Sequence, residues 1–294
     1  MLKYWFKNKN HKFIFFKILT KIMANTYDGK CFCVVTSASK GFGRSITQLL
    51  LQESGLLHNA ESGSKILLMA RNNSGLESTK EISLKTAFKP ERFHFDLCTI
   101  DFSTPEAVQD IVKKYLETLD TEFKHVFIFS NAGFLGDVSK TLVDHDNISD
   151  IQIVVNINVI SPYYIVSNFC KHFKSSRCFV INTSSHAALK PMPSIGLYCS
   201  VKACMDMFMQ NLTMDCPSIR TLNYAPGPMD TDMAEKLMNE AGNKDLSNIF
   251  KTLFREGTIV KPIDSATMLM LLLKKNEFTS GVHIEYNDER KCKL

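Results

Sequence analysis

The feature that most limits the possible folds is a regular alternation of short apolar runs with longer stretches of helical periodicity. The runs are apolar throughout, which is typical of strands buried on both faces. Such strands, separated by helices, form a parallel sheet covered on both sides. The expected strands occupy 31–36, 65–70, 93–100, 125–130, 178–184, 219–225 and 282–286, and the expected helices include 43–54, 104–118, 147–173 and 197–213. We therefore predict an α/β fold: one doubly wound domain with a seven-stranded parallel sheet and helices on both faces.

The domain organisation follows from where this rhythm begins and ends. Residues 23–288 form the single predicted domain, preceded by a basic leader (1–22) and followed by a short tail (289–294). Residues 52–64 read as a surface loop after the first helix. Residues 228–262, after the sixth expected strand, have a helical pattern and contain no strand. A helical insertion at the carboxyl end of a strand is where a substrate lid would lie.

The net charge of +5 is concentrated in the leader, which holds six lysines and no acidic residue. Without these six charges the rest of the chain has a net charge of −1, so the composition does not indicate a basic surface for binding nucleic acid. The leader lacks arginine and a small-residue cleavage site, which favours an extension over a targeting signal. A membrane-surface role for it stays open. No apolar run approaches the ~20 residues that span a membrane, and "MLMLLL" (268–273) reads as a buried helix face.

Nine scattered cysteines, with no C-x-x-C pair, indicate reduced thiols of an intracellular protein, and we expect a cytoplasmic location and no metal site. The last three residues, Cys-Lys-Leu, are similar to the peroxisomal targeting signal Ser-Lys-Leu, so a peroxisomal location is a weaker alternative to the cytoplasmic one.

The stretch "TSASKGFG" (36–43) follows the first strand and opens the first helix, as a dinucleotide-binding turn does. Glycines there let the backbone approach a pyrophosphate, and the helix N-terminus donates N–H groups to the anion. The cofactor candidates in this turn are Ser37, Ser39, Lys40, Gly41, Phe42 and Gly43.

The second strand ends in Arg71, where an enzyme that takes the unphosphorylated cofactor usually has an acid. Lys40 offers a second cation within the turn. Because a guanidinium suits a dianionic phosphate, the pair favours NADP(H).

The "YCSVK" stretch places Tyr198 and Lys202 four residues apart, on one face of a helix. A neighbouring ammonium is expected to lower the pKa of the phenol, so that it can exchange a proton with a carbonyl oxygen. Ser184 and Ser185 end the preceding strand, where a hydroxyl could polarise the same oxygen.

Other candidates lie at strand ends or in the next helix, where a cofactor crossing the carboxyl edge would pass. They are Asp101, Asn131, Ala132, Gly133, Asn158, Pro226, Gly227 and Met229.

Together these residues resemble the short-chain dehydrogenase/reductase family, from Cys31 to Asp288. The resemblance implies a Rossmann-type fold in which Tyr198 is the acid/base and Lys202 lowers its pKa and holds the nicotinamide ribose. It also implies that Ser185 orients the carbonyl, that Asn158 holds a proton-relay water, and that Asn131 and Gly133 line the adenosine side.

Four stretches, "FLGDVSK", "GLYCSVKA", "YAPGPMDTDM" and "SGVHIEYND", are similar to the pterin-reducing members of that family. This narrower resemblance implies reduction of a pterin side-chain carbonyl, with Asp288 anchoring the ring beside Ser185, Tyr198 and Gly227. It also implies a homodimer. A broad carbonyl reductase and a non-catalytic NADPH-binding protein are the alternatives.

Ser37 departs from the family pattern, which has glycine at this position. We expect φ < 0 at Ser37, because a small residue would then fit with little penalty. On that basis Ser37→Gly changes NADPH affinity by less than about tenfold.

Overall fold

The computed structural model of the chain describes residues 27–288, which form a three-layer α/β structure around one seven-stranded sheet. The predicted leader lies outside these residues, as does the predicted tail. The strand order is β3-β2-β1-β4-β5-β6-β7, and all six pairings are parallel. The strands are β1 (Cys31–Thr36), β2 (Ser64–Ala70), β3 (Phe93–Thr99), β4 (His125–Ser130), β5 (Arg177–Thr183), β6 (Arg220–Ala225) and β7 (His283–Glu285). The predicted fold class is confirmed.

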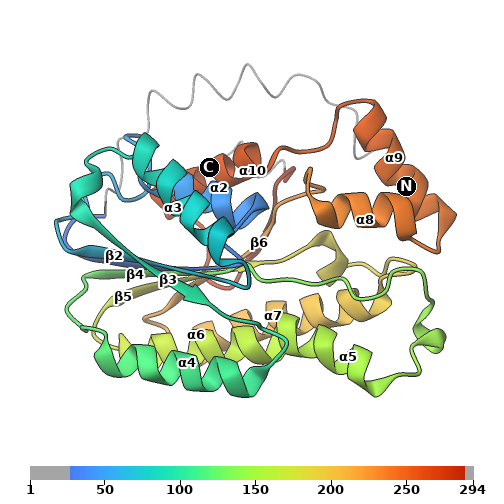
Figure 1. Cartoon of the computed structure of the whole chain (residues 1–294), viewed down its shortest axis with the longest axis horizontal. Helices are drawn as coiled ribbons and strands as arrows, with labels where there is room; N and C mark the ends of the chain where they lie inside the picture. The colour runs from blue at the N-terminus through green and yellow to red at the C-terminus, as the bar shows by residue number, and fades with distance from the viewer. Residues whose placement is uncertain (1–26, 289–294) are drawn as a thin grey trace.

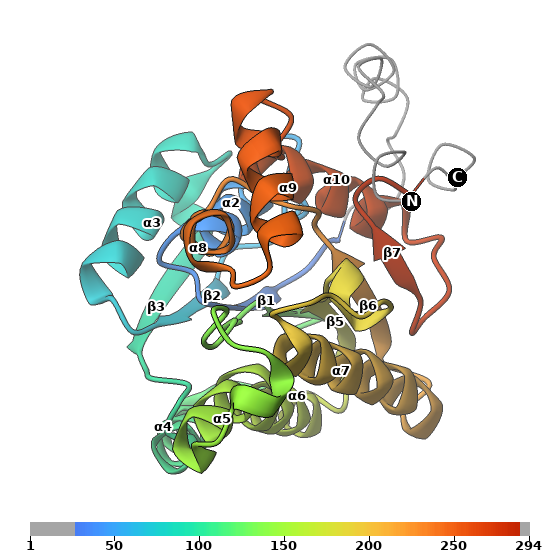
Figure 2. The ribbon, with the colours of Figure 1, turned by 90° about the vertical axis from the view of Figure 1, so that its right-hand side faces the viewer.

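Helices cover both faces of the sheet (Figures 1 and 2). One face carries α2 (Gly41–Leu50), α3 (Asn73–Thr86) and α10 (Pro262–Lys275). The other carries α4 (Pro105–Thr118), α5 (Ile148–Val155), the π-helical turn η4 (Asn156–Ile160), α6 (Ser161–His172) and α7 (Gly196–Asp215). Short 3₁₀ turns are η2 (Pro90–Arg92), η3 (Leu142–Asp144) and η5 (His186–Ala188).

Each face of the sheet has its own hydrophobic core, which explains why the strands are apolar at every position. In β1, Cys31, Cys33 and Val35 point to the α2 side, whereas Phe32 and Val34 point to the α4 side. Successive side chains of a strand alternate between faces, so a strand covered on both sides needs apolar residues throughout. The "MLMLLL" run lies in α10 with Leu269 and Leu273 fully buried, as predicted.

Two local predictions need correction. The first helix ends at Leu50 and not at 54, and the 52–64 segment is more than a surface loop. Leu56, Leu57 and Ala60 are buried in the core on the α2 side, so apolar side chains anchor this connection against the sheet.

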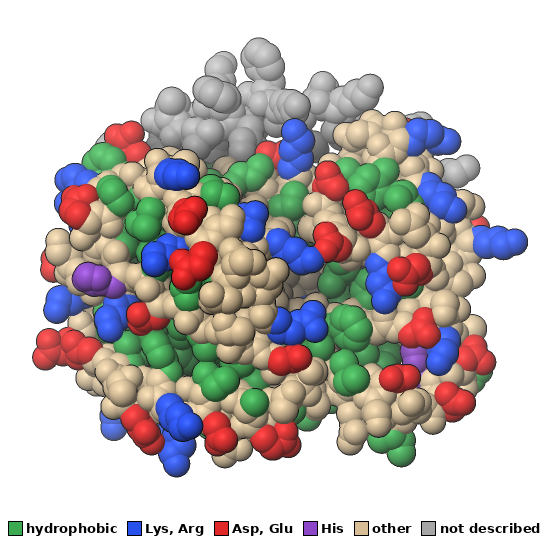
Figure 3. All heavy atoms as spheres, in the orientation of Figure 1, with side chains coloured by type: hydrophobic (Ala, Val, Ile, Leu, Met, Phe, Trp, Pro, Cys, Tyr) green, Lys and Arg blue, Asp and Glu red, His purple; other side chains and the backbone are tan. Residues whose placement is uncertain are grey.

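The helical stretch Ile148–His172 is long and apolar enough, by length and composition alone, to cross a membrane. The search for uninterrupted apolar runs did not find it, because polar residues interrupt the stretch. Half of its most apolar window is buried inside the protein, as in the core helix of a soluble fold. Acidic and basic side chains are interspersed over the face drawn in Figure 3.

The segment after β6 forms two helices, α8 (Asp232–Glu240) and α9 (Lys244–Arg255), on the same side of the sheet as α2 (Figure 2). Its predicted helical character is confirmed, and an isolated bridge joins Met229 to Val260. A third core lies beneath it, where Leu237 and Phe250 pack with Leu135 and Tyr198. The helical segment therefore covers the predicted acid/base residue.

Two hydrogen bonds hold the helical segment in place at the α8–α9 turn, and its role as a substrate lid stays a prediction. The Gly242 N–H donates to Val138 O (2.9 Å), and the Asn243 N–H donates to Ser194 Oγ (2.7 Å). A Cβ at Gly242 would lie 2.2 Å from Ser139 O, closer than any real contact. The turn therefore requires glycine because the two backbones meet there.

The connection from β1 to α2 overturns one prediction. Ser37 has φ = +51°, in the left-handed region, and not the negative value expected. The chain must reverse at once to place the α2 N-terminus over the strand end, and this geometry normally uses glycine. The turn is therefore locally strained.

Replacing Ser37 by glycine should raise the free energy of unfolding. Left-handed backbone is disfavoured by roughly 1–2 kcal/mol for a residue with a Cβ, and the extra freedom of glycine in the unfolded chain offsets about 0.4–1 kcal/mol. We expect a net gain of about 0.5–1 kcal/mol in urea unfolding. Unchanged or reduced stability would show that the serine side chain compensates for the strain.

Replacing Gly242 by alanine should loosen the lid. The added methyl meets backbone, so relief requires movement of the whole turn, and overpacking of this kind costs about 1–3 kcal/mol. Urea unfolding should show that loss, and hydrogen exchange should speed up at Gly242 and Asn243. Wild-type values in both measurements would contradict the close approach.

Candidate active site at the carboxyl edge of the sheet

The side chain of Thr36, at the end of β1, ties three strand ends together. Its Oγ1 accepts the N–H groups of Asn131 (2.8 Å) and Ala132 (2.9 Å), which follow β4. Asn131 Nδ2 donates to Thr36 O (3.0 Å), and Asn131 Oδ1 accepts from Thr183 Oγ1 at the end of β5 (3.1 Å). The predicted strand-end residues therefore lie together. The sequence analysis missed the role of Thr36, although its place at a strand end was visible.

The predicted cofactor turn lies directly against this junction. A Cβ at Gly43 would lie 2.5 Å from Ser37 O and 2.8 Å from Asn131 Nδ2, so α2 packs on the strand ends through a bare backbone. Gly41 has φ = +55° at the start of α2. The Phe42 side chain is buried and stacks on Tyr224, so only its backbone can face a ligand. These features suit a helix N-terminus that receives a phosphate.

The two predicted phosphate-binding cations lie near the ends of β1 and β2. Lys40 is exposed and forms an ion pair with Asp232 at the start of α8. Arg71 is exposed directly after β2. Burial raises the pKa of Asp101, but hydrogen bonds with Ser103 and the charge of Arg71 outweigh it, so the pKa is lowered overall. Ser39 lies behind these groups, with its carbonyl accepting from Arg44.

Tyr198, Lys202 and Ser185 come together beneath the lid. Lys202 is buried, its Nζ donates to Thr183 O (2.8 Å), and it lies 5.5 Å from the centre of the Tyr198 ring. Ser185 caps η5, with its Oγ accepting from the Ala187 N–H (3.1 Å), and it also hydrogen-bonds Tyr198. The neighbouring Ser184 Oγ is buried without a hydrogen-bond partner.

The expected lowering of the Tyr198 pKa is not found. Burial raises that pKa above its usual value, and the hydrogen bond with Ser185 offsets the rise only in part. Lys202 lies against the ring face and donates a hydrogen bond to Thr183 O, so its charge is not directed at the phenol oxygen. Burial also lowers the pKa of Lys202 to about 8. Tyr198 is therefore a protonated donor at neutral pH.

Asn158 lies in the π-helical turn η4 and is buried. Its Oδ1 accepts from the Phe134 N–H (3.1 Å), and its Nδ2 donates to the carbonyls of Phe134 and Val154 (both 2.8 Å). The side chain thus fixes the segment after β4, and its predicted hold on a water stays a prediction. A Cβ at Gly133 would lie 3.5 Å from Lys202 Nζ and 3.6 Å from Asn158 Oδ1, so the three residues meet.

The other edge of the site is built from the ends of β6 and β7. Pro226 O accepts from Ser265 Oγ (2.9 Å), and Gly227 turns the chain with φ = +81°. The Tyr286 side chain lies 3.6 Å from a Cβ built at Gly227. Asp288, two residues further on, is half-buried and its N–H donates to Glu285 O (3.0 Å).

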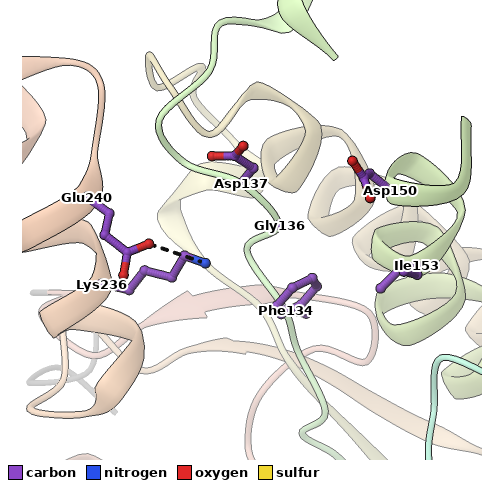
Figure 4. A pocket seen from close by; sticks show the side chains of 7 residues that line it. All are labelled: Phe134, Gly136, Asp137, Asp150, Ile153, Lys236 and Glu240. Carbon is purple, nitrogen blue, oxygen red and sulfur yellow. Dashed lines mark ion pairs between the residues drawn. The ribbon is translucent and has the colours of Figure 1, made fainter. Parts of the chain in front are cut away.

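A cavity of about 500 Å³ opens beside the segment that Asn158 fixes (Figure 4). Lys236 and Glu240 of α8 form an ion pair on one side, and α5 lies opposite. The lining residues, which the sequence analysis did not single out, are Phe134, Gly136, Asp137, Asp150, Ile153, Lys236 and Glu240. No group of three metal-ligating side chains is found over residues 27–288.

A second group of residues that the sequence analysis missed lies behind Lys202. Asp206 Oδ2 is 2.6 Å from His283 Nδ1, and Glu285 Oε1 is 2.7 Å from His186 Nδ1. Two signals could have revealed it. Asp206 follows Lys202 by one helical turn, and His283 and Glu285 alternate on the last strand and so share one face.

Known proteins are similar to this chain in sequence and in structure. The family model described as short chain dehydrogenase matches residues 32–242. Sepiapterin reductase of Rattus norvegicus is 33% identical over 264 residues, covering 88% of this chain and 97% of that protein. The enzyme of Xenopus tropicalis is 34% identical over 263 residues, with the same coverage. A short-chain dehydrogenase/reductase of Saccharomyces cerevisiae superposes with a TM-score of 0.71 at 22% identity, covering 89% of this chain and 98% of that one. The chain belongs to the short-chain dehydrogenase/reductase family and is an NADP(H)-dependent oxidoreductase.

Proposed function

We propose that this protein reduces the side-chain carbonyl of pterins with NADPH, as a sepiapterin reductase. On this proposal it acts on sepiapterin and completes tetrahydrobiopterin formation from 6-pyruvoyl-tetrahydropterin. The observation that carries the proposal is the similarity to sepiapterin reductases along nearly their whole length.

The residues at the carboxyl edge fit NADP(H). The bare backbone at Gly43 leaves no side chain between α2 and the strand ends, and the α2 N-terminus offers N–H donors to the pyrophosphate. Lys40 and Arg71 would hold the 2′-phosphate, which would compete with Asp232 for Lys40. The other proposed contacts are Ser37, Ser39, Gly41, Phe42 through its backbone, Asp101, Asn131, Ala132, Gly133, Tyr198, Lys202, Pro226, Gly227 and Met229.

Bound NADPH supplies the hydride that reduces the carbonyl carbon. Tyr198 donates a proton from Oη to the carbonyl oxygen, and its raised pKa means that the phenol is protonated before the reaction. Ser185, hydrogen-bonded to Tyr198, holds the same oxygen. Lys202 would hold the ribose, and Asn158 would help to return the proton.

Asp288 is the proposed anchor for the pterin ring. Its carboxylate can accept two hydrogen bonds from the 2-amino and ring N–H groups, which fixes the ring relative to Tyr198. It lies at the end of β7, where Tyr286 packs on Gly227, so the anchor sits on the same edge as the reacting groups.

A homodimer through the outer faces of α6 and α7 belongs to the proposal. Tyr163 and Met207 are each more than half exposed there, and Met214 is 78% exposed. Tyr163 packs on Phe208, with ring centres 4.2 Å apart, so apolar side chains of the two helices meet on this face. Exposed apolar groups of this kind mark an interaction surface. The small-molecule reaction and the free thiols of the described cysteines suit a cytoplasmic enzyme.

A broad carbonyl reductase on the same scaffold is the second candidate, because Tyr198, Lys202 and Ser185 come together in an arrangement that suits any carbonyl group. Asp288 separates the two candidates, since a small ketone has no guanidine-like edge for it to bind.

Tyr198→Phe should abolish reduction and weaken cofactor binding much less, because it removes only one of the proposed NADPH contacts. The phenyl ring keeps the packing beneath the lid but removes the proton donor, and positioned proton transfer contributes about 10²–10⁴-fold to rate. NADPH oxidation in the presence of sepiapterin measures the rate, and NADPH fluorescence measures binding. A variant that keeps most of its activity would refute the role of Tyr198.

Asp288→Ala should raise KM for sepiapterin at least tenfold and leave a small diketone such as 2,3-butanedione unaffected. Losing a charge-assisted hydrogen bond pair costs about 1.5–3 kcal/mol, which supports that size of change. Asp120→Ala, an exposed carboxylate at the opposite edge of the sheet, is the matched control. An unchanged KM for sepiapterin would favour the broad reductase, as would a wild-type protein that reduces the diketone and not sepiapterin.

A further inference from the structure

A buried array of ionisable side chains joins α7 to β7 behind the reacting groups. Lys202 and Asp206 are each only 4% exposed and lie one helical turn apart on α7. Lys202 Nζ donates to Thr183 O, and no ion pair within 4 Å involves this lysine among residues 27–288. The lysine therefore carries its charge in a dry site with only a carbonyl at hydrogen-bond distance. Such a charge is unstable unless a carboxylate lies near enough to attract it.

Asp206 is that carboxylate, and three strands hold it in place. Its Oδ1 accepts from Asn182 Nδ2 on β5 (3.1 Å), and its Oδ2 pairs with His283 Nδ1 on β7 (2.6 Å). Asn223 of β6 donates to the backbone carbonyl of the same residue (3.1 Å). Both carboxylate oxygens are engaged, so Asp206 cannot rotate to meet Lys202 directly and acts on it through space.

The array continues from His283 toward the surface of the site. The Nε2 atom of His283 is buried without a hydrogen-bond partner, 3.9 Å from Glu285 Oε1. That same oxygen pairs with Nδ1 of His186, the residue next to Ser185. Besides Lys202 and Asp206, the ionisable side chains facing the array are Tyr198 from α7, His186 from η5, and His283 and Glu285 from β7.

We propose that Asp206 is a positioning residue that keeps Lys202 an ammonium, and that His283 fixes Asp206 for this task. The inference rests on the proposed reductase function, in which Lys202 holds the ribose beside Tyr198. Asp206 touches neither substrate nor cofactor and acts only through Lys202. The electrostatics agree: burial lowers the pKa of Lys202 to about 8, and the charge of Asp206 is the influence that opposes the fall.

The pH dependence follows from the sign of this influence. The ammonium form is needed, so activity should fall as pH rises through the pKa of Lys202. Removing the Asp206 charge lowers that pKa further, so the fall should begin at lower pH. An opposite charge in a buried site shifts a pKa by about one unit or more, which sets the expected displacement.

The test compares wild type with Asp206→Asn, which keeps the shape of the side chain and removes its charge. The alkaline limb of kcat/KM for carbonyl reduction should move down by about one pH unit, with activity restored toward wild type at lower pH. Titration of the ¹³C-labelled Lys202 side chain by NMR, assigned with Lys202→Arg, should show the same displacement without any substrate. Asp96→Asn, which also removes a carboxylate that accepts a side-chain hydrogen bond, is the matched control and should leave both unchanged.

His283→Leu provides the second variant if Asp206→Asn fails to fold. It leaves the charge of Asp206 in place and frees the carboxylate to turn toward Lys202, so both readouts should move to higher pH, opposite to the shift in Asp206→Asn. A folded variant of either kind with the wild-type Lys202 titration would overturn the proposal. If the wild-type protein reduces no pterin, the NMR titration still decides the role of Asp206, so the two failures are distinguishable.

Discussion

The hydroxyl of Thr36 accepts two backbone N–H groups from the segment after β4, and the geometry of the site depends on this contact. It joins β1 to its neighbour β4, the central strand, at the edge where the parallel strands end. Asn131 extends the link to β5 and also lies against Gly43, so the cofactor turn, the segment after β4 and the β5 end move as one unit. Every other functional group is positioned relative to that unit.

Burial is the second organising influence. The core beneath α8 and α9 buries Tyr198, and burial raises the pKa of the phenol, which is therefore protonated at neutral pH. The same dryness disfavours the ammonium of Lys202, which lies against the Tyr198 ring. The buried ammonium of Lys202 needs a negative charge nearby to stabilise it. The carboxylate of Asp206, held between β5 and β7 by hydrogen bonds, provides that charge. Burial thus favours the neutral form of both groups: it keeps the Tyr198 phenol protonated, and it works against the charge on Lys202.

Much of the fold and part of the site could be predicted from the sequence, because those features depend on local pattern. Continuous apolar runs fixed the seven strands to within a residue or two, and strand-end positions gathered Asn131, Gly133 and Lys202 on one edge. The left-handed Ser37 was not predictable, since backbone strain there depends on where α2 must land. The lowered Tyr198 pKa was wrong because spacing on a helix does not show where a side chain points. The Asp206–His283 pair joins residues 77 apart, which no local pattern connects.

A crystal structure of the protein with NADP⁺ and a pterin tests the account most directly, because it reads every proposed contact at once. We expect the side-chain oxygen of the pterin within hydrogen-bond distance of Tyr198 Oη and Ser185 Oγ. We also expect Lys202 on the nicotinamide ribose, Arg71 and Lys40 on the 2′-phosphate, and Asp288 on the 2-amino edge of the ring. A pterin bound with its side chain turned away from Tyr198, or with Asp288 free in solvent, would contradict these expectations.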